Sequence, residues 1–183
     1  MATIFSKISK QAGDIRRSGV WYRNAVSSLG NVSPGRAMKD GKINARPTVG
    51  RLNLFFYNPK TKEKLPYYDT FPLVLPIGPM PKGFLGINFH YLSPNIRFRL
   101  LQQLQRFASN TKFDSTTRLN INWGNVGRMS LIRPTVKRYL WGHVGSGFLR
   151  INLDDAPTAV YLPVQRFRKA SAETVYARSR RGI

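Results

Sequence analysis

The sequence predicts an α+β fold in which helices pack on a small, mostly antiparallel sheet. Short segments in which apolar and polar residues alternate, a pattern typical of strands, recur between residues 51 and 153. Between them lies one longer segment with the spacing of an amphipathic helix. The 183 residues, 42% of them hydrophobic, are enough for one domain with a buried core. We therefore divide the chain into a basic N-terminal arm (1–50), an α+β body (51–165) and a basic C-terminal tail (166–183).

The strands of the body are predicted from alternation. In residues 51–57, the side chains of Leu52, Leu54 and Phe56 fall on one face. The other segments with strand character are residues 84–92, 118–123 and 148–153. Residues 71–77 are apolar but contain prolines, which cannot donate to a ladder, so they are expected to form a short buried or edge segment. This segment and the tyrosines before it, Tyr67 and Tyr68, are expected to supply core beneath the long helix.

The long helix is predicted over residues 94–108. Ser93 is a natural N-cap, and Pro94 suits the first helical position. Apolar residues recur at helical spacing from Ile96 to Phe107, and Arg97 is predicted to point away from this stripe. A second helix is predicted to begin near Pro134.

Turn-forming residues govern the prediction for the N-terminal 50 residues. Residues 3–12 and 21–29 have the pattern of short amphipathic helices, and residues 30–50 are rich in glycine and proline. We therefore expect an extended arm with limited contact to the body. At the other end, the tail is predicted to form a short helix from about Ala172 with a frayed basic end.

Charge is the strongest functional signal in the composition. The chain has 30 lysines and arginines against 8 acidic residues, which gives a formal net charge of +22. Such a chain repels itself unless an anionic partner lies beside it, and nucleic acid is the usual one. A membrane surface is the second candidate, but no segment approaches the about 20 consecutive apolar residues of a spanning helix. No membrane partner is therefore expected.

Few residues in the sequence are suited to catalysis. His90 is expected to be a core or edge residue whose hydrogen bonds are satisfied, and His143 is expected to lie in a turn. Asp154 and Asp155 precede a helix start, where capping explains at least one of them. The eight acids are spread over the chain, whereas two-metal nucleases need clustered carboxylates. We expect no enzyme activity, no metal, no cofactor and no small-molecule substrate.

The sequence predicts one kind of binding, contact with the phosphates of a nucleic acid. Arg16 and Arg17 stand just before Trp21, Tyr22 and Arg23, so the aromatic rings could stack on exposed bases while the arginines bind phosphate. Alternatively, the rings pin an amphipathic helix to the body. The predicted nucleic-acid-binding residues are Arg16, Arg17, Trp21, Tyr22, Arg23, Lys39, Lys42, Arg46, Arg128, Arg133, Lys137, Arg138, Arg166, Arg168, Lys169, Arg178, Arg180 and Arg181.

The body also resembles a known family. The segments "FYNPKTKEKLPYYDTFPLVLPI", "GFLGINFHYLSPNIRFRLL", "KRYLWGHVGSGFLRI" and "AVYLPVQRFRKAS" are similar to the DNA end protector proteins of T4-like tailed phages. The resemblance covers roughly residues 51–178. It implies a virion structural protein, made in the host cytoplasm, that binds the ends of packaged duplex DNA, shields them from host exonuclease and contacts other virion proteins.

Two other interpretations remain open. One is a structural protein of the neck, tail or baseplate, whose basic arms tether neighbouring subunits. The other is a ribosomal-type RNA-binding protein, because small, basic, arm-bearing proteins are common in ribosomes. Charge alone does not separate DNA from RNA, since phosphate contacts carry no sequence information.

Overall fold

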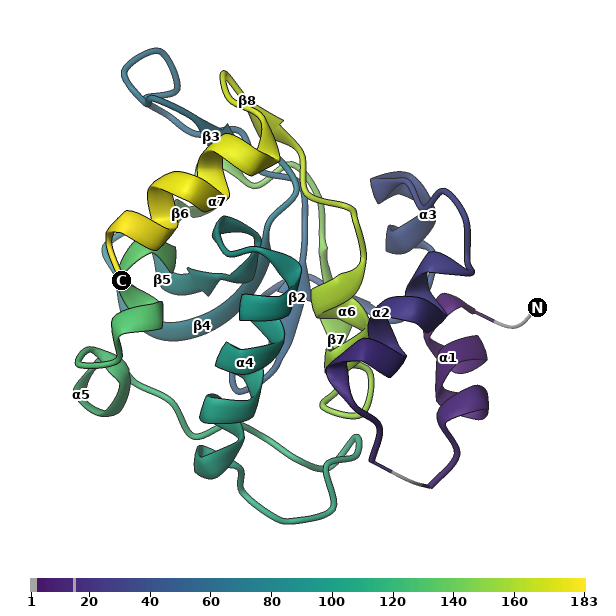
Figure 1. Cartoon of the computed structure of the whole chain (residues 1–183). Helices are drawn as coiled ribbons and strands as arrows, with labels where there is room; N and C mark the ends of the chain where they lie inside the picture. Colours follow the sequence, from purple (N-terminus) through teal and green to yellow (C-terminus); the bar gives the residue numbers. More distant parts are fainter. Residues whose placement is uncertain (1–2, 15) are drawn as a thin grey trace.

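A six-stranded antiparallel sheet runs through the centre of the protein in the order β1-β7-β2-β4-β5-β6. The computed structural model describes residues 3–14 and 16–183 (Figure 1). The strands of this sheet are β1 (Ile43–Asn44), β2 (Leu52–Leu54), β4 (Leu73–Met80), β5 (Gly83–Asn88), β6 (Val136–Leu140) and β7 (Phe148–Ile151). A second, two-stranded sheet pairs β3 (Tyr68–Asp69) with β8 (Phe167–Arg168).

Helices cover the sheet and extend to one side of it (Figure 1). Helices α4, α6 and α2 pack against one another in that order. The α-helices are α1 (Ile4–Ala12), α2 (Gly19–Ser27), α3 (Pro34–Met38), α4 (Pro94–Leu104), α5 (Trp123–Val126), α6 (Ala156–Tyr161) and α7 (Ala172–Arg181). Short 3-10 helices are η1 (Phe89–Tyr91), η2 (Gln105–Phe107), η3 (Ser130–Thr135) and η4 (Trp141–His143).

The predicted α+β class and antiparallel sheet are confirmed. The long helix is present as α4 continued by η2, with Ser93 at its N-cap and Pro94 in its first turn. The tail helix begins at Ala172 as predicted. Strand β4 contains prolines although it lies inside the sheet, but it pairs with β2 only through Leu73 and Val74. Its prolines therefore lie where the strand has one neighbour, a position that tolerates a missing donor.

The extended N-terminal arm is the main error of the sequence prediction. The two short amphipathic helices are present as α1 and α2, but they pack on the body. Ile4 and Ile8 are 2% and 0% exposed, and both belong to the main core cluster. The carboxylate of Asp40 accepts hydrogen bonds from the amides of Ile4 (2.8 Å) and Phe5 (3.0 Å) and so holds the start of α1 beside the end of α3.

Turn-forming residues of the N-terminal segment are compatible with helices, because Gly13 ends α1 and Pro34 begins α3. Gly13 follows α1 with φ +64°, a conformation that glycine adopts without steric cost, and its amide bonds the carbonyl of Ser9. Residues 43–44 then join the sheet as the edge strand β1. The apolar faces of α1 and α2 are too small to be stable alone, and burial against the body supplies what they lack.

Two further element predictions are wrong. Residues 136–140 form strand β6 rather than a helix from Pro134, because the edge of β5 is free to pair and Pro134 lies within η3. In residues 118–123 the alternation is real, since Leu119 and Ile121 are buried. However, the β-bridge that this segment makes in the described chain joins Leu119 to Ala108, and the amide of Leu119 donates to the carbonyl of Gly50 outside any strand. This segment covers the core without joining the sheet.

Arg97, predicted to face outward, is fully buried. Its guanidinium donates to the carbonyls of Leu92 (2.7 Å) and Val160 (3.0 Å), and to the hydroxyl of Tyr176 (2.7 Å). A longer bond of 3.4 Å reaches the carbonyl of His90. The helix is covered by α6 on one flank and reached by α7 on another, so its buried stripe is wider than its apolar residues indicate.

Asp69 is the second buried charge, and its carboxylate joins distant parts of the chain. It accepts hydrogen bonds from the amides of Phe71 and Arg166 (both 3.0 Å), from Asn88 (3.2 Å) and from Nδ1 of His90 (2.8 Å). Burial alone would raise the pKa of Asp69, but His90 and the amide donors outweigh burial and lower it. Burial lowers the pKa of His90. Because a carboxylate only accepts hydrogen bonds, Nδ1 of His90 is the donor in their contact. His90 is thus a core histidine.

Replacing Ile8 tests whether α1 is part of the core. We expect Ile8→Ala to reduce the free energy of unfolding by about 2–4 kcal/mol, because it removes buried methylenes and leaves a cavity. Lys7→Ala, one position earlier on the exposed face, should change it by less than about 0.5 kcal/mol. Urea denaturation measures both. Equal effects of the two substitutions would restore the arm interpretation.

Arg97→Ala tests the buried guanidinium. We expect a loss of about 3–5 kcal/mol, since four oxygen acceptors in a buried site lose their donor together. Arg99→Ala is the matched control, because Arg99 lies two residues away on the exposed side of α4. Thermal and urea unfolding of both variants give the comparison. A neutral Arg97→Ala would show that these acceptors find other partners.

Candidate nucleic-acid interface

The structure separates the predicted phosphate-binding residues into groups on different sides of the molecule. Helices α1 to α3 lie on one side in Figure 1, and α7 lies on the other. Helix α5 is on the same side as the C-terminal end of α7. The predicted residues that are exposed are Arg16, Arg23, Lys39, Lys42, Arg46, Arg128, Arg133, Arg138, Arg166, Arg168, Lys169, Arg178, Arg180 and Arg181. They do not form one continuous binding surface.

The aromatic pair of α2 pins the helix to the body. Tyr22 is 9% exposed, and its ring lies 6.3 Å from that of Phe98 and 5.0 Å from that of Trp21. Trp21 is half-buried and packs on the core, with the guanidinium of Arg17 5.2 Å from its ring. Stacking of Tyr22 on a base is therefore wrong as a prediction. The alternative, attachment of an amphipathic helix, is what the structure has.

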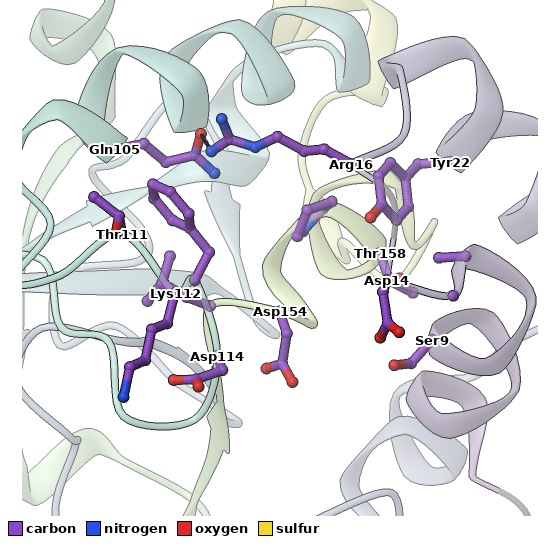
Figure 2. A pocket seen from close by; sticks show the side chains of 15 residues that line it. Ser9, Asp14, Arg16, Tyr22, Gln105, Thr111, Lys112, Asp114, Asp154 and Thr158 are labelled. Atoms are coloured by element: carbon purple, nitrogen blue, oxygen red, sulfur yellow. Dashed lines mark hydrogen bonds between the residues drawn. The ribbon is translucent and has the colours of Figure 1, made fainter.

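Acidic residues surround a cavity of about 520 Å³ on the α1 side, here called the acidic cleft. Figure 2 shows the carboxylates of Asp114 and Asp154 side by side at one end of it, with that of Asp14 nearby. The side chain of Arg16 extends along the opposite end and donates to Oε1 of Gln105 at 3.0 Å. Arg16 and Lys112 also line the cleft, so three carboxylates face two cations there.

Two more acids extend this negative region. Burial, together with the charges of Asp154 and Asp40, raises the pKa of Asp155 to about 7. Burial also raises the pKa of Asp154, and Asp114 adds to the effect. Five of the eight acidic residues of the chain therefore lie near one another on the α1 and α6 side. Over residues 3–14 and 16–183, no group of three or more metal-ligating side chains is placed to hold a metal ion.

The opposite side carries almost unopposed positive charge. We call it the basic face, and it consists of the loop of residues 58–67, strand β8 and helix α7. Its exposed or half-exposed cations are Lys60, Lys62, Lys64, Arg166, Arg168, Lys169, Arg178, Arg180 and Arg181. The acids in these segments are Glu63 and Glu173. Pairing of β3 with β8 brings the loop and the C-terminal segment together.

Lys169 holds this loop in place. Its Nζ donates to the carbonyls of Lys62 (2.6 Å), Glu63 (3.0 Å) and Leu65 (3.0 Å), so all three ammonium protons are used. Its backbone has φ +69°, an uncommon conformation for a lysine. The prediction that Lys169 binds phosphate is corrected accordingly, because its ammonium is committed to the loop and acts as a positioning group.

The strand at residues 136–140 also changes the interpretation of Lys137 and Arg138. On a helix they would share one edge, but on β6 they point to opposite sides. Arg138 is exposed, whereas Lys137 is half-buried, with Nζ 4.0 Å from the centroid of the Tyr91 ring. Burial lowers the pKa of Lys137 to about 8. Lys137 therefore belongs to a pocket rather than to an open surface.

That pocket has a volume of about 500 Å³, and we call it the tyrosine pocket. The five tyrosines that line it are Tyr57, Tyr67, Tyr68, Tyr91 and Tyr139. Lys60, Lys137 and Arg138 also line it. Sequence reasoning assigned Tyr67 and Tyr68 to the core and left out the loop lysines. The signal that was available is the run "KTKEKLPYY", in which three lysines directly precede two tyrosines.

The fold and the charges define a small, strongly basic α+β protein. The sequence model of the family described as "Phage T4 terminal DNA protecting protein" matches residues 8–180, so the chain belongs to this family. The match begins within α1, and so it includes the N-terminal helices that the resemblance over residues 51–178 left out. The resemblance itself is confirmed. Searches of curated proteins and of solved structures found no match to this chain.

The family description names protection of the terminal DNA of a bacteriophage. A search of the described part of the chain for a helix long and apolar enough to cross a membrane found none.

The raised pKa of Asp155 predicts a pH-dependent stability. The folded state holds this proton up to about pH 7, whereas the unfolded chain loses it near the ordinary value of 3.8. The stability contribution is therefore fully present below pH 3.8 and is lost as the pH rises towards 7. Asp155→Asn should raise the free energy of unfolding by about 1–2 kcal/mol more at pH 8 than at pH 5, after discounting for partial exposure. Thermal unfolding at both pH values measures this, and an equal gain at both would contradict it.

Proposed function

We propose that the protein binds the ends of linear packaged phage DNA through phosphate contacts and shields them from exonuclease without catalysing a reaction. It would act in the virion and, during assembly, in the host cytoplasm. The family description supports DNA termini as the target. The observation that carries the proposal is the uneven distribution of charge, with nine cations against Glu63 and Glu173 on the basic face and five acidic residues in or near the acidic cleft.

The basic face is the surface that we assign to the duplex. A DNA duplex approaching it meets the cations of the loop, β8 and α7, and releases its own counterions as phosphates are neutralised. On the acidic cleft side, the same duplex would meet the carboxylates of Asp14, Asp114 and Asp154. Arg128 is exposed two residues after α5, which lies on the same side as the C-terminal end of α7, and it extends the surface available to the duplex.

The histidines support a role without chemistry. His90 is 0% exposed and donates to buried Asp69, so substrate does not reach it. His143 has its Nδ1 2.9 Å from the carbonyl of Asn58 and serves to hold the loop. Protection by such a protein is steric, since an exonuclease cannot engage an end that is already covered.

The alternative of a structural tether has lost its strongest argument. It relied on an extended N-terminal arm, and α1 to α3 are packed on the body. The ribosomal alternative is disfavoured by a family described by its protection of DNA. Contacts with other virion proteins remain part of the proposal, and the exposed apolar residues Val20 and Val49 are available for them.

A matched pair of double variants tests the basic face. Arg180→Gln with Arg181→Gln removes two exposed cations from the end of α7, and Lys7→Gln with Lys10→Gln removes two from α1. The net charge of both variants is the same. If about half of the cations of the basic face engage phosphate, the slope of log K against log salt is about −4 for the wild type. The α7 variant should flatten it by about one to two units for every DNA sequence, and the α1 variant should leave it unchanged.

The measurement is fluorescence anisotropy on a short linear duplex over a range of salt concentrations. Digestion of a long linear duplex by an exonuclease that requires a free end gives the protection assay. The α7 variant should protect less at matched protein concentration, and the α1 variant should protect as the wild type does. Equal losses in both variants would show that net charge, and not the basic face, determines binding.

A further inference from the structure

End recognition requires more than the basic face can supply. Phosphates are present along the whole duplex, so contacts to them position a protein but do not distinguish an end from an internal site. What an end offers, and the interior does not, is a terminal base that is stacked on one side only and frays readily. A protein that recognises ends therefore needs a site that admits a nucleotide out of the duplex.

The tyrosine pocket has the dimensions and walls of such a site. Its volume of about 500 Å³ falls within the range of about 300–1,000 Å³ that is usual for small-ligand sites. Tyr57, Tyr91 and Tyr139 are buried and form the inner wall, each less than 10% exposed. Tyr67 and Tyr68 are half-buried and lie on the loop side, where a ring face can meet an incoming base.

Positively charged side chains lie against the tyrosine rings of the pocket. Lys137 holds its ammonium 4.0 Å from the Tyr91 ring centroid, and the guanidinium of Arg178 lies 5.4 Å from that of Tyr67. Lys60 and Arg138 also line the pocket. Burial has already lowered the pKa of Lys137 to about 8, so an acceptor atom beside it would compensate for lost hydration. Aromatic faces interleaved with cations are the combination that binds single-stranded nucleic acid.

The loop wall of the pocket is fixed before any ligand arrives. Three carbonyls of the loop bind the ammonium of Lys169, and the Nδ1 of His143 is 2.9 Å from the carbonyl of Asn58 at the start of the loop. Asp69 and Asn88 line the base of the pocket but are bonded to each other and to the core. The pocket is therefore held open by the fold, and a ligand would not have to order its wall.

We propose that the tyrosine pocket receives the terminal nucleotide of a DNA strand, with the base against the tyrosines and its phosphates on the cations at the mouth. This inference rests on the proposed function and explains how ends are preferred. Extracting a terminal base costs less than flipping an internal one, because its pair is already frayed and it has one stacking neighbour. The basic face then supplies affinity for any duplex, and the pocket supplies the preference for an end.

The test compares two DNAs of the same sequence, a blunt linear duplex and a covalently closed circular duplex. Tyr67→Ala removes a ring of the outer wall, and Thr61→Trp blocks the pocket from an exposed lining position without removing any core side chain. Trp123→Ala is the control, since Trp123 is 55% exposed and does not line the pocket. Circular dichroism confirms that each variant is folded.

We expect wild type and Trp123→Ala to bind the linear duplex more tightly than the circle. Both pocket variants should lose about 10-fold of affinity for the linear duplex and keep their affinity for the circle. If either folded pocket variant retains the full preference for linear DNA, the pocket is not the end-binding site. If the wild type itself shows no preference and no protection from exonuclease, the proposed function fails, and this outcome is distinct from failure of the pocket.

Cross-linking locates the terminal base directly. A duplex with 5-iododeoxyuridine at its terminal position is irradiated in complex with the full chain, and the modified peptide is mapped by mass spectrometry. We expect the modification within residues 57–68 or at Tyr91 or Tyr139. A cross-link confined to α1, α2 or α3 would overturn the assignment.

Discussion

A buried polar network, centred on Asp69 and Arg97, is the constraint on which the rest of the structure depends. Neither side chain is accessible, and each is surrounded by hydrogen-bond partners from several elements. Asp69 binds the amide of Arg166, which fixes the strand that precedes α7, and Arg97 binds the hydroxyl of Tyr176 within α7. His90 joins the two, because its ring bonds Asp69 and its carbonyl accepts from Arg97. The segment that carries the basic face is thereby attached to the core through polar bonds rather than through a large apolar surface.

This attachment has a consequence for binding. Helix α7 is strongly basic, and an apolar interface broad enough to hold it would leave fewer positions for exposed cations. With Val175 and Tyr176 as its points of attachment, the helix keeps Arg178, Arg180 and Arg181 on the solvent side. The cost of burying Asp69 and Arg97 is offset because the carboxylate and the guanidinium are each surrounded by hydrogen-bond partners, although Nε2 of His90 in the same network has none among the described residues. A buried network of this kind fixes orientation, which is what a phosphate-binding surface requires.

Periodicity predicted those elements whose side chains obey one pattern throughout. The positions of helix α4 and strand β7 were predicted in this way, because their apolar residues recur at the helical spacing and at the alternating spacing of a strand. Periodicity failed where contacts with residues distant in the sequence determine the burial of a side chain or the position of a segment. The charge of Arg97 predicted an exposed side chain, but the side chain is buried. Two of its acceptors, on Val160 and Tyr176, come from residues far along the chain. The N-terminal glycines suggested an arm, although α1 is held by Asp40 and by core contacts that no local pattern contains.

For the candidate site, too, the sequence predicted the features that depend on composition and did not predict those that depend on tertiary contacts. Net charge predicted a polyanionic partner, and the chain belongs to a family of DNA protecting proteins. Charge could not predict that five acids gather on one side, or that Lys169 is committed to three carbonyls. The loop lysines and the tyrosines beside them are adjacent in sequence, but the pocket between them also requires Lys137 and Tyr139 from β6. Affinity for duplex DNA can thus be proposed from composition alone, whereas the end preference that we propose requires a cavity that exists only once β6 is in place.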